Sequence, residues 1–136
     1  MSINTVPASR VTPEKIERLG EREIFVFGSS LMGVHFGDAA RVAYDKFGAG
    51  GVSEGLKGST YAIPTMRASV EMIKPYVDEF ISFACTHTEY HFLVTRIGCG
   101  IAGFTDRDIA PLFCDAVDVP NIALPLSFWH VIFSLG

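Results

Sequence analysis

Apolar residues along this chain fall into two patterns, short continuous runs and longer helical stripes. The continuous runs lie at residues 24–27, 61–63, 91–95 and 121–124, and β-branched and aromatic side chains are frequent in them. A run without polar alternation is typical of a parallel strand that is covered on both faces. We therefore predict four strands of one mainly parallel sheet.

Helical stripes and capping signals lie between these runs. Apolar side chains recur three and four positions apart over residues 69–87, which predicts one long helix with a buried face. Capping residues and glycine stops predict shorter helices at residues 12–19 and 38–47, from Thr105 onward, and at residues 127–135.

Strands and helices alternate along the chain, and a glycine-rich stretch at residues 49–59 is predicted to be a loop. The alternation predicts an α/β fold in which helices cover both faces of the sheet, giving three layers, α/β/α. A length of 136 residues suits one domain, so we expect residues 1–136 to form a single one.

Two of the predicted strands run directly into glycine-rich loops that lead to a helix. In open parallel sheets, ligands bind outside the carboxyl ends of the strands, and the free N–H groups at a helix start bind anions. The pattern predicts a site for a phosphate-bearing, nucleotide-like ligand; glycines that merely turn the chain are the alternative. The candidate ligand-binding residues are Gly28, Ser29, Ser30, Gly33, His35, Gly37, Arg96, Gly98, Cys99, Gly100, Ile101, Ala102, Gly103 and Phe104.

Several loop residues have two interpretations each. His35 and Asp38 are the candidates for acid–base catalysis, against a structural hydrogen bond for His35 and a helix N-cap for Asp38. Cys99 is expected to be a small packing residue, because the sequence places no base beside it to activate a nucleophile. Arg96 is expected to anchor its loop or to face an anion. Phe104 either stacks on a base or ribose or packs in the core.

Composition and charge exclude several classes of function. The formal net charge is −4, and the 11 Lys and Arg residues are scattered, so no nucleic-acid partner is expected. Apolar stretches are too short for a membrane span, and the amino terminus does not resemble a signal peptide. Three widely spaced cysteines without a Cys-x-x-Cys pair predict reduced thiols in a cytoplasmic protein and no metal site. No cofactor is expected.

The apolar carboxyl-terminal segment has two interpretations. Aromatic and branched residues crowd positions 128–133. An exposed face of that kind would favour a homodimer, whereas packing into the domain's own core would explain the same residues without a partner.

The second loop and its strand resemble those of a known family. The text R-I-G-C-G-I-A-G-F at residues 96–104, preceded by F-L-V-T, resembles the second ligand loop of macro domains, which bind ADP-ribose. The match is closest to the branch that removes terminal ADP-ribose. The chain also resembles uncharacterised bacterial and phage proteins with V-F-G-S-N-L-A-G, Y-A-I-P-T and T-R-I-G-C-G motifs, over residues 24 to about 129.

This resemblance implies a three-layer macro-domain-like fold and an ADP-ribose-like ligand. It implies that residues 98–103 surround the diphosphate and the proximal ribose, with Phe104 near the distal ribose and the first loop on the other side. Where the hydrolytic branch has a Lys, this chain has Thr65 and Met66, and where that branch has an Asp, this chain has Ala102. The mechanism of that branch is therefore not expected here.

Three functions remain open at this point. The first is a binding domain for an ADP-ribose-like or other phosphate-bearing nucleotide. The second is a hydrolase that acts on an ADP-ribosyl or phosphate ester bond. The third is a non-catalytic interaction protein whose loops no longer bind a ligand, an interpretation favoured by the bulk of Phe36 and the charge of Asp38 in the first loop.

Overall fold

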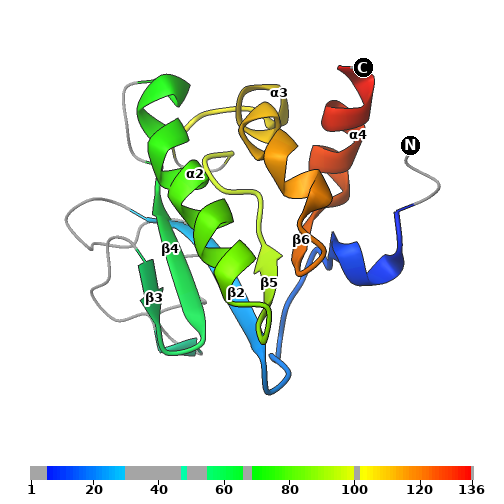
Figure 1. The fold of residues 1–136 in the computed structure, drawn as a ribbon. Helices are drawn as coiled ribbons and strands as arrows, with labels where there is room; N and C mark the ends of the chain where they lie inside the picture. Colours follow the sequence, from blue (N-terminus) through cyan, green and yellow to red (C-terminus); the bar gives the residue numbers. More distant parts are fainter. Residues whose placement is uncertain (1–5, 30–46, 49–54, 66–68, 100–101, 136) are drawn as a thin grey trace.

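The fold is α/β, with a mostly parallel sheet. The structure, a computed structural model, describes residues 6–29, 47–48, 55–65, 69–99 and 102–135. Within these residues the sheet order is β1-β6-β5-β2-β4-β3 (Figure 1), and every neighbouring pair is parallel except β3 and β4. The strands are β1 (Val11–Thr12), β2 (Glu23–Ser29), β3 (Gly55–Lys57), β4 (Thr60–Pro64), β5 (His91–Val94) and β6 (Ile122–Pro125). The four predicted runs are thus strands of one sheet, as expected.

The helices of the described residues follow the predicted order after β4. The longest, α2, buries a stripe of side chains at the predicted spacing, including Ile73, Val77 and Phe80. A short α-helix, α3, continues as a 3-10 helix, η3, and Pro111, which has no N–H group to donate, lies in the first turn of η3. The helices are η2 (Ala8–Arg10, 3-10), α2 (Val70–Thr86), α3 (Asp106–Ile109), η3 (Ala110–Asp118) and α4 (Leu126–Ser134).

Side chains of β2 alternate between two apolar clusters on opposite faces of the sheet. Ile24 and Val26 belong to the large cluster that also contains buried residues of α2, η3 and α4. Phe25 and Phe27 belong to a smaller cluster on the other face. Burial on both faces explains why this strand has no polar alternation.

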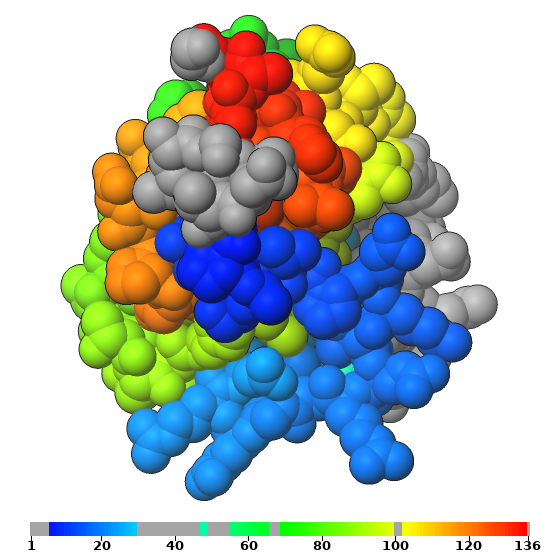
Figure 2. Space-filling model, turned by 90° about the vertical axis from the view of Figure 1, so that its right-hand side faces the viewer, coloured from blue at the N-terminus to red at the C-terminus, as the bar shows by residue number. Residues whose placement is uncertain are grey.

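The helix predicted at residues 12–19 is wrong. Thr12 lies in β1, paired with Pro125, and residues 15–20 have no regular secondary structure. Arg10 fixes this path, because its guanidinium group donates to carbonyl oxygens of Ile122 (2.7 Å) and Ala116 (2.9 Å). The dark-blue amino-terminal residues accordingly lie beside the orange η3 in Figure 2. The apolar residues predicted on the helix, Ile16 and Leu19, instead pack against the smaller cluster.

The loop predicted at residues 49–59 contains an additional strand. β3 pairs with β4 in an antiparallel hairpin, closed by a turn at Gly58 and Ser59. Gly58 has a φ of +58°, which glycine adopts readily and which suits a two-residue hairpin turn. The loop prediction is therefore wrong for residues 55–57, and residues 49–54 lie outside the described residues. The helix predicted at residues 38–47 lies outside the described residues except for Phe47.

The carboxyl-terminal aromatic residues pack into their own domain. Phe128 and Trp129 are buried, and the indole Nε1 of Trp129 donates to the carbonyl oxygen of Arg10 at 2.7 Å. These two residues therefore give no support to a dimer surface, although Leu126 and Leu135 are exposed. In the described part of the chain, the helices are too short or too polar to cross a membrane.

Candidate functional site

Three parallel strands bring their carboxyl ends together at one edge of the sheet. Gly28 is near the end of β2, Thr65 follows β4, and Gly98 follows β5. A β-carbon on Gly28 would lie 2.6 Å from Thr65 Oγ1 and 3.5 Å from the backbone nitrogen of Gly98. The backbone N–H of Thr65 donates to the carbonyl oxygen of Ser29 at 2.9 Å. The two glycine loops thus start side by side, as the sequence predicts.

The chain changes direction in the sheet between β2 and β5. After β2 the chain continues to β4 on one side, and after β5 it continues to β6 on the other side. Phe47, on the connection after β2, packs on the smaller cluster, whereas α3 and η3 after β5 contribute to the large one. In open α/β sheets, ligands bind outside the carboxyl ends of the strands at such a reversal of strand order.

Backbone contacts close the second loop on itself. Gly98 has a φ of +74°, and its carbonyl oxygen accepts from the N–H of Phe104 at 2.8 Å. A β-carbon on Gly98 would lie 2.9 Å from Cδ1 of the buried Ile109, so the loop is packed against α3 at this point. Phe104 packs against the large cluster, in agreement with its core interpretation.

Asp106 joins the second loop to the starts of two helices. Its carboxylate accepts two hydrogen bonds from Arg96, from Nε to Oδ1 and from Nη2 to Oδ2, both at 3.0 Å. Oδ1 also accepts from Ser127 Oγ at 3.2 Å and from Cys99 Sγ at 3.6 Å. Ser127 lies in the first turn of α4, so one carboxylate connects the ends of β5 and β6. Arg96 therefore anchors its loop, one of its two predicted roles.

Burial and the charges of this cluster shift the pKa values of Asp106 and Cys99. Partial burial raises the pKa of the Asp106 carboxyl, but hydrogen bonds and the positive charge of Arg96 outweigh this and bring the pKa below its usual value. Burial, followed by the negative charge of Asp106, raises the pKa of the Cys99 thiol to about 12. A thiol with this pKa is protonated at neutral pH, so Cys99 is not an activated nucleophile.

The role of Asp106 was not predicted from the sequence. Thr105 and Asp108 form a capping box at the predicted helix start: Asp108 N donates to Thr105 Oγ1 at 3.3 Å, and Thr105 N donates to Asp108 Oδ2 at 2.9 Å. Because two of the four residues 105–108 explain the helix start, Asp106 looked like an ordinary first-turn acid. A spacing of ten residues does not by itself predict the contact between Asp106 and Arg96, which forms only in the folded loop.

The remaining predicted residues divide into described and undescribed positions. Ser29 is buried at the end of β2, Ala102 is half-buried, and Gly103 is exposed with a φ of +86°. Cys85 and Cys114 are exposed free thiols. In the described ranges, no group of three or more His, Cys, Asp or Glu side chains could hold a metal ion. Ser30, Gly33, His35, Gly37, Asp38, Gly100 and Ile101 lie outside the described residues.

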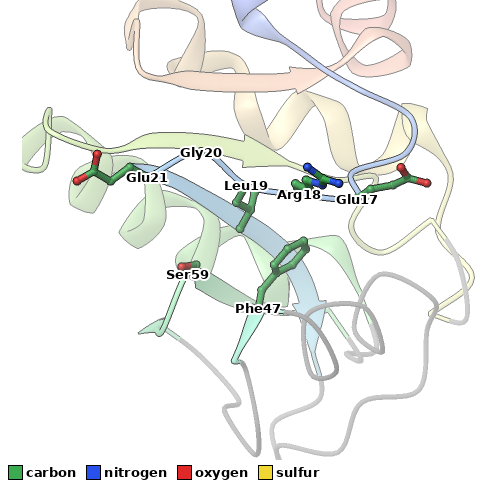
Figure 3. A pocket seen from close by; sticks show the side chains of 7 residues that line it. All are labelled: Glu17, Arg18, Leu19, Gly20, Glu21, Phe47 and Ser59. Carbon is green, nitrogen blue, oxygen red and sulfur yellow. The ribbon is translucent and has the colours of Figure 1, made fainter.

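A separate hollow lies at the opposite ends of the strands. It has a volume of about 610 Å³, and Leu19 and Phe47 contribute apolar side chains to its wall (Figure 3). Gly20 precedes β2 and Ser59 precedes β4, so the hollow is near the amino ends of these strands and away from the two glycine loops. The other lining residues are Glu17, Arg18 and Glu21.

Comparisons with known proteins give no match. No protein-family model matches the chain, and neither a curated protein nor a solved structure matches it at a significant level.

Proposed function

We propose that this protein is a binding domain for an ADP-ribose-like, phosphate-bearing ligand held between its two glycine loops. The observation that supports this most strongly is the approach of Gly28 to Gly98, where a β-carbon on the first would lie 3.5 Å from the nitrogen of the second. Glycines at the two strand ends let the two loops begin this close together. The position between β2 and β5 is the one where open α/β sheets bind ligands.

The chemistry of the described rim favours recognition of an anion by backbone amides. Gly98 and Gly103 both have positive φ values within one short loop, and such values occur in the turns whose backbone N–H groups bind anions. The R-I-G-C-G resemblance to macro domains points to the same loop. With it we propose the finer architecture, a three-layer, macro-domain-like α/β/α fold.

We propose binding without the hydrolytic mechanism of the macro domains that remove ADP-ribose. The methyl side chain of Ala102 can neither donate nor accept a proton. Thr65 cannot form the covalent intermediate that a lysine forms in that branch. The thiol of Cys99, with its pKa raised to about 12, does not replace them. The free thiols are compatible with the cytoplasm, which we propose as the compartment.

Calorimetry on a matched pair of glycine variants tests this function. Gly103 and Gly55 have φ values of +86° and +82°, and a β-carbon on either meets nothing within 4 Å. Gly103→Ala and Gly55→Ala therefore introduce the same backbone strain, the first in the second loop and the second in β3. We expect wild type to bind ADP-ribose and AMP but not adenosine, Gly103→Ala to bind more weakly, and Gly55→Ala to bind like wild type. Equal loss in both variants, or no binding by wild type at millimolar ligand, would contradict the proposal.

A further inference from the structure

The guanidinium group of Arg96 is held at one edge and open at the other. Nε and Nη2 donate side-on to the two oxygens of Asp106. In the described part of the chain, Nη1 has no hydrogen-bond partner, and 58% of the Arg96 side chain is exposed. A planar guanidinium group has five N–H donors in a fixed arrangement. The side-on pair uses two of them; of the three that remain, one on Nη1 and one on Nη2 point along the outer edge.

This outer edge has the geometry of a fork for a second oxyanion. Arginine pairs with carboxylates and phosphates through two parallel N–H···O bonds, and its planar group is fixed once one edge is paired. Asp106 is in turn fixed by Ser127 and by the thiol of Cys99. A side chain that would otherwise sample many rotamers is thus ordered before any ligand arrives, which reduces the entropy cost of binding.

We propose that Arg96 binds a phosphate group of the ligand through this outer edge, and that Asp106 is the residue that positions it. The inference rests on the proposed function and names the group that recognises charge at the rim of the second loop. Arg96 lies two residues before Gly98, whose amide is at the meeting point of the strand ends. Backbone amides would then bind one part of the ligand, and Arg96 a second, outer phosphate.

The competing interpretation is that Asp106 merely neutralises Arg96. The two interpretations predict opposite effects of Asp106→Asn. If Asp106 only masks charge, removing its negative charge strengthens the binding of an anion. If it positions the guanidinium group, the same change leaves Arg96 disordered and weakens binding, by about threefold to tenfold for one side chain that must be immobilised. The sign of the change therefore decides between them.

The test is calorimetry with ADP-ribose and inorganic pyrophosphate as probes, on wild type and four variants. We expect Arg96→Gln to weaken binding by about 10- to 100-fold, as for the loss of a charge-assisted pair. Arg96→Lys should give an intermediate loss, because the charge is kept but the fork is not. Asp106→Asn should weaken binding at every salt concentration. The control is Arg107→Gln, which removes the same charge from an exposed position on α3 and should change binding less than about twofold.

Each outcome is decisive. If Arg96→Gln and Arg107→Gln behave alike, or if Asp106→Asn binds more tightly than wild type, the inference is wrong while the proposed function stands. If wild type binds neither probe, the proposed function fails and the inference fails with it. Arg96→Lys keeps the test valid if Arg96→Gln loosens the loop, and circular dichroism of each variant reports the fold.

Discussion

The hydroxyl group of Thr65 lies against the position that a β-carbon on Gly28 would occupy. A β-carbon on Gly28 would lie 2.6 Å from Thr65 Oγ1 and 3.3 Å from Thr65 Cγ2, and Thr65 is itself buried. The ends of β2 and β4 therefore pack so closely that only glycine is accommodated without movement. The same closeness brings the first loop to the second, on which the proposed site depends.

This contact predicts a specific coupling between two substitutions. Gly28→Ala should lower the free energy of unfolding by about 1–3 kcal/mol, because the added methyl group overpacks a buried position. Thr65→Ala should recover much of that loss in the double variant, because it removes both opposing atoms. Urea denaturation of the two single variants and the double variant measures the coupling. If Gly28→Ala lowers the free energy of unfolding equally with Thr or Ala at position 65, this contact is not what restricts position 28 to glycine.

Gly98 and Gly103 allow the cost of backbone strain to be measured separately from the cost of overpacking. Gly103→Ala should cost about 1 kcal/mol of unfolding free energy, because its φ of +86° is unfavourable for alanine but no atom lies nearby. Gly98→Ala should cost more, about 2–3 kcal/mol, since its β-carbon also meets Ile109 Cδ1 at 2.9 Å. Urea denaturation is again the measurement. In the Ile109→Val background, which lacks that atom, the two costs should approach each other; an unchanged difference would rule out this contact as the cause.

The thiols should differ in reactivity. At pH 8, a thiol with a pKa of about 12 is ionised in only about one molecule in ten thousand. Iodoacetamide should therefore modify the exposed Cys85 and Cys114 in the native protein and leave Cys99 unmodified. Mass spectrometry of peptides gives the extent at each site, and labelling in urea is the control in which all three react. Rapid native labelling of Cys99 would mean that Asp106 and burial do not protect it.

The ion pair of Arg96 and Asp106 should make stability depend on acid pH. The folded pKa of Asp106 is depressed, so its contribution is complete above the ordinary carboxyl pKa of 3.8 and is lost as the pH falls through the folded value. The difference in urea midpoint between wild type and Asp106→Asn should be constant above about pH 5 and shrink below about pH 4. A difference that stays constant down to pH 2 would contradict the depressed pKa.

The sheet was predictable from the sequence because burial on both faces requires continuous apolar runs, as at Ile24 and Phe25. The long helix α2 was predictable because it buries one face. The path of residues 13–20 was not, because the same spacing of Ile16 and Leu19 suits either a helix or an extended segment packed on the smaller cluster. The pairing of Thr12 with Pro125 places this segment in the sheet, and these two residues are far apart in sequence.

Part of the candidate site was predictable from local sequence signals. Glycines shortly after the apolar runs indicated that two strands end near Gly28 and Gly98, since that signal is local. The close approach of Gly28 and Thr65 depends on the order of the strands in the sheet. The role of Asp106 depends on how the second loop folds back toward Arg96. Neither follows from spacing along the chain. The contacts that anchor Arg96 to Asp106 likewise appear only in the folded loop.

The most direct test of the central claim is a titration of ¹⁵N-labelled protein with ADP-ribose, followed by amide chemical shifts. The account predicts saturable shifts at Ser29, Gly98, Cys99 and Gly103, and none at Leu19 or Ser59 beside the separate hollow. Shifts confined to the hollow, or no saturable shift at millimolar ADP-ribose, would contradict a ligand site between the two glycine loops.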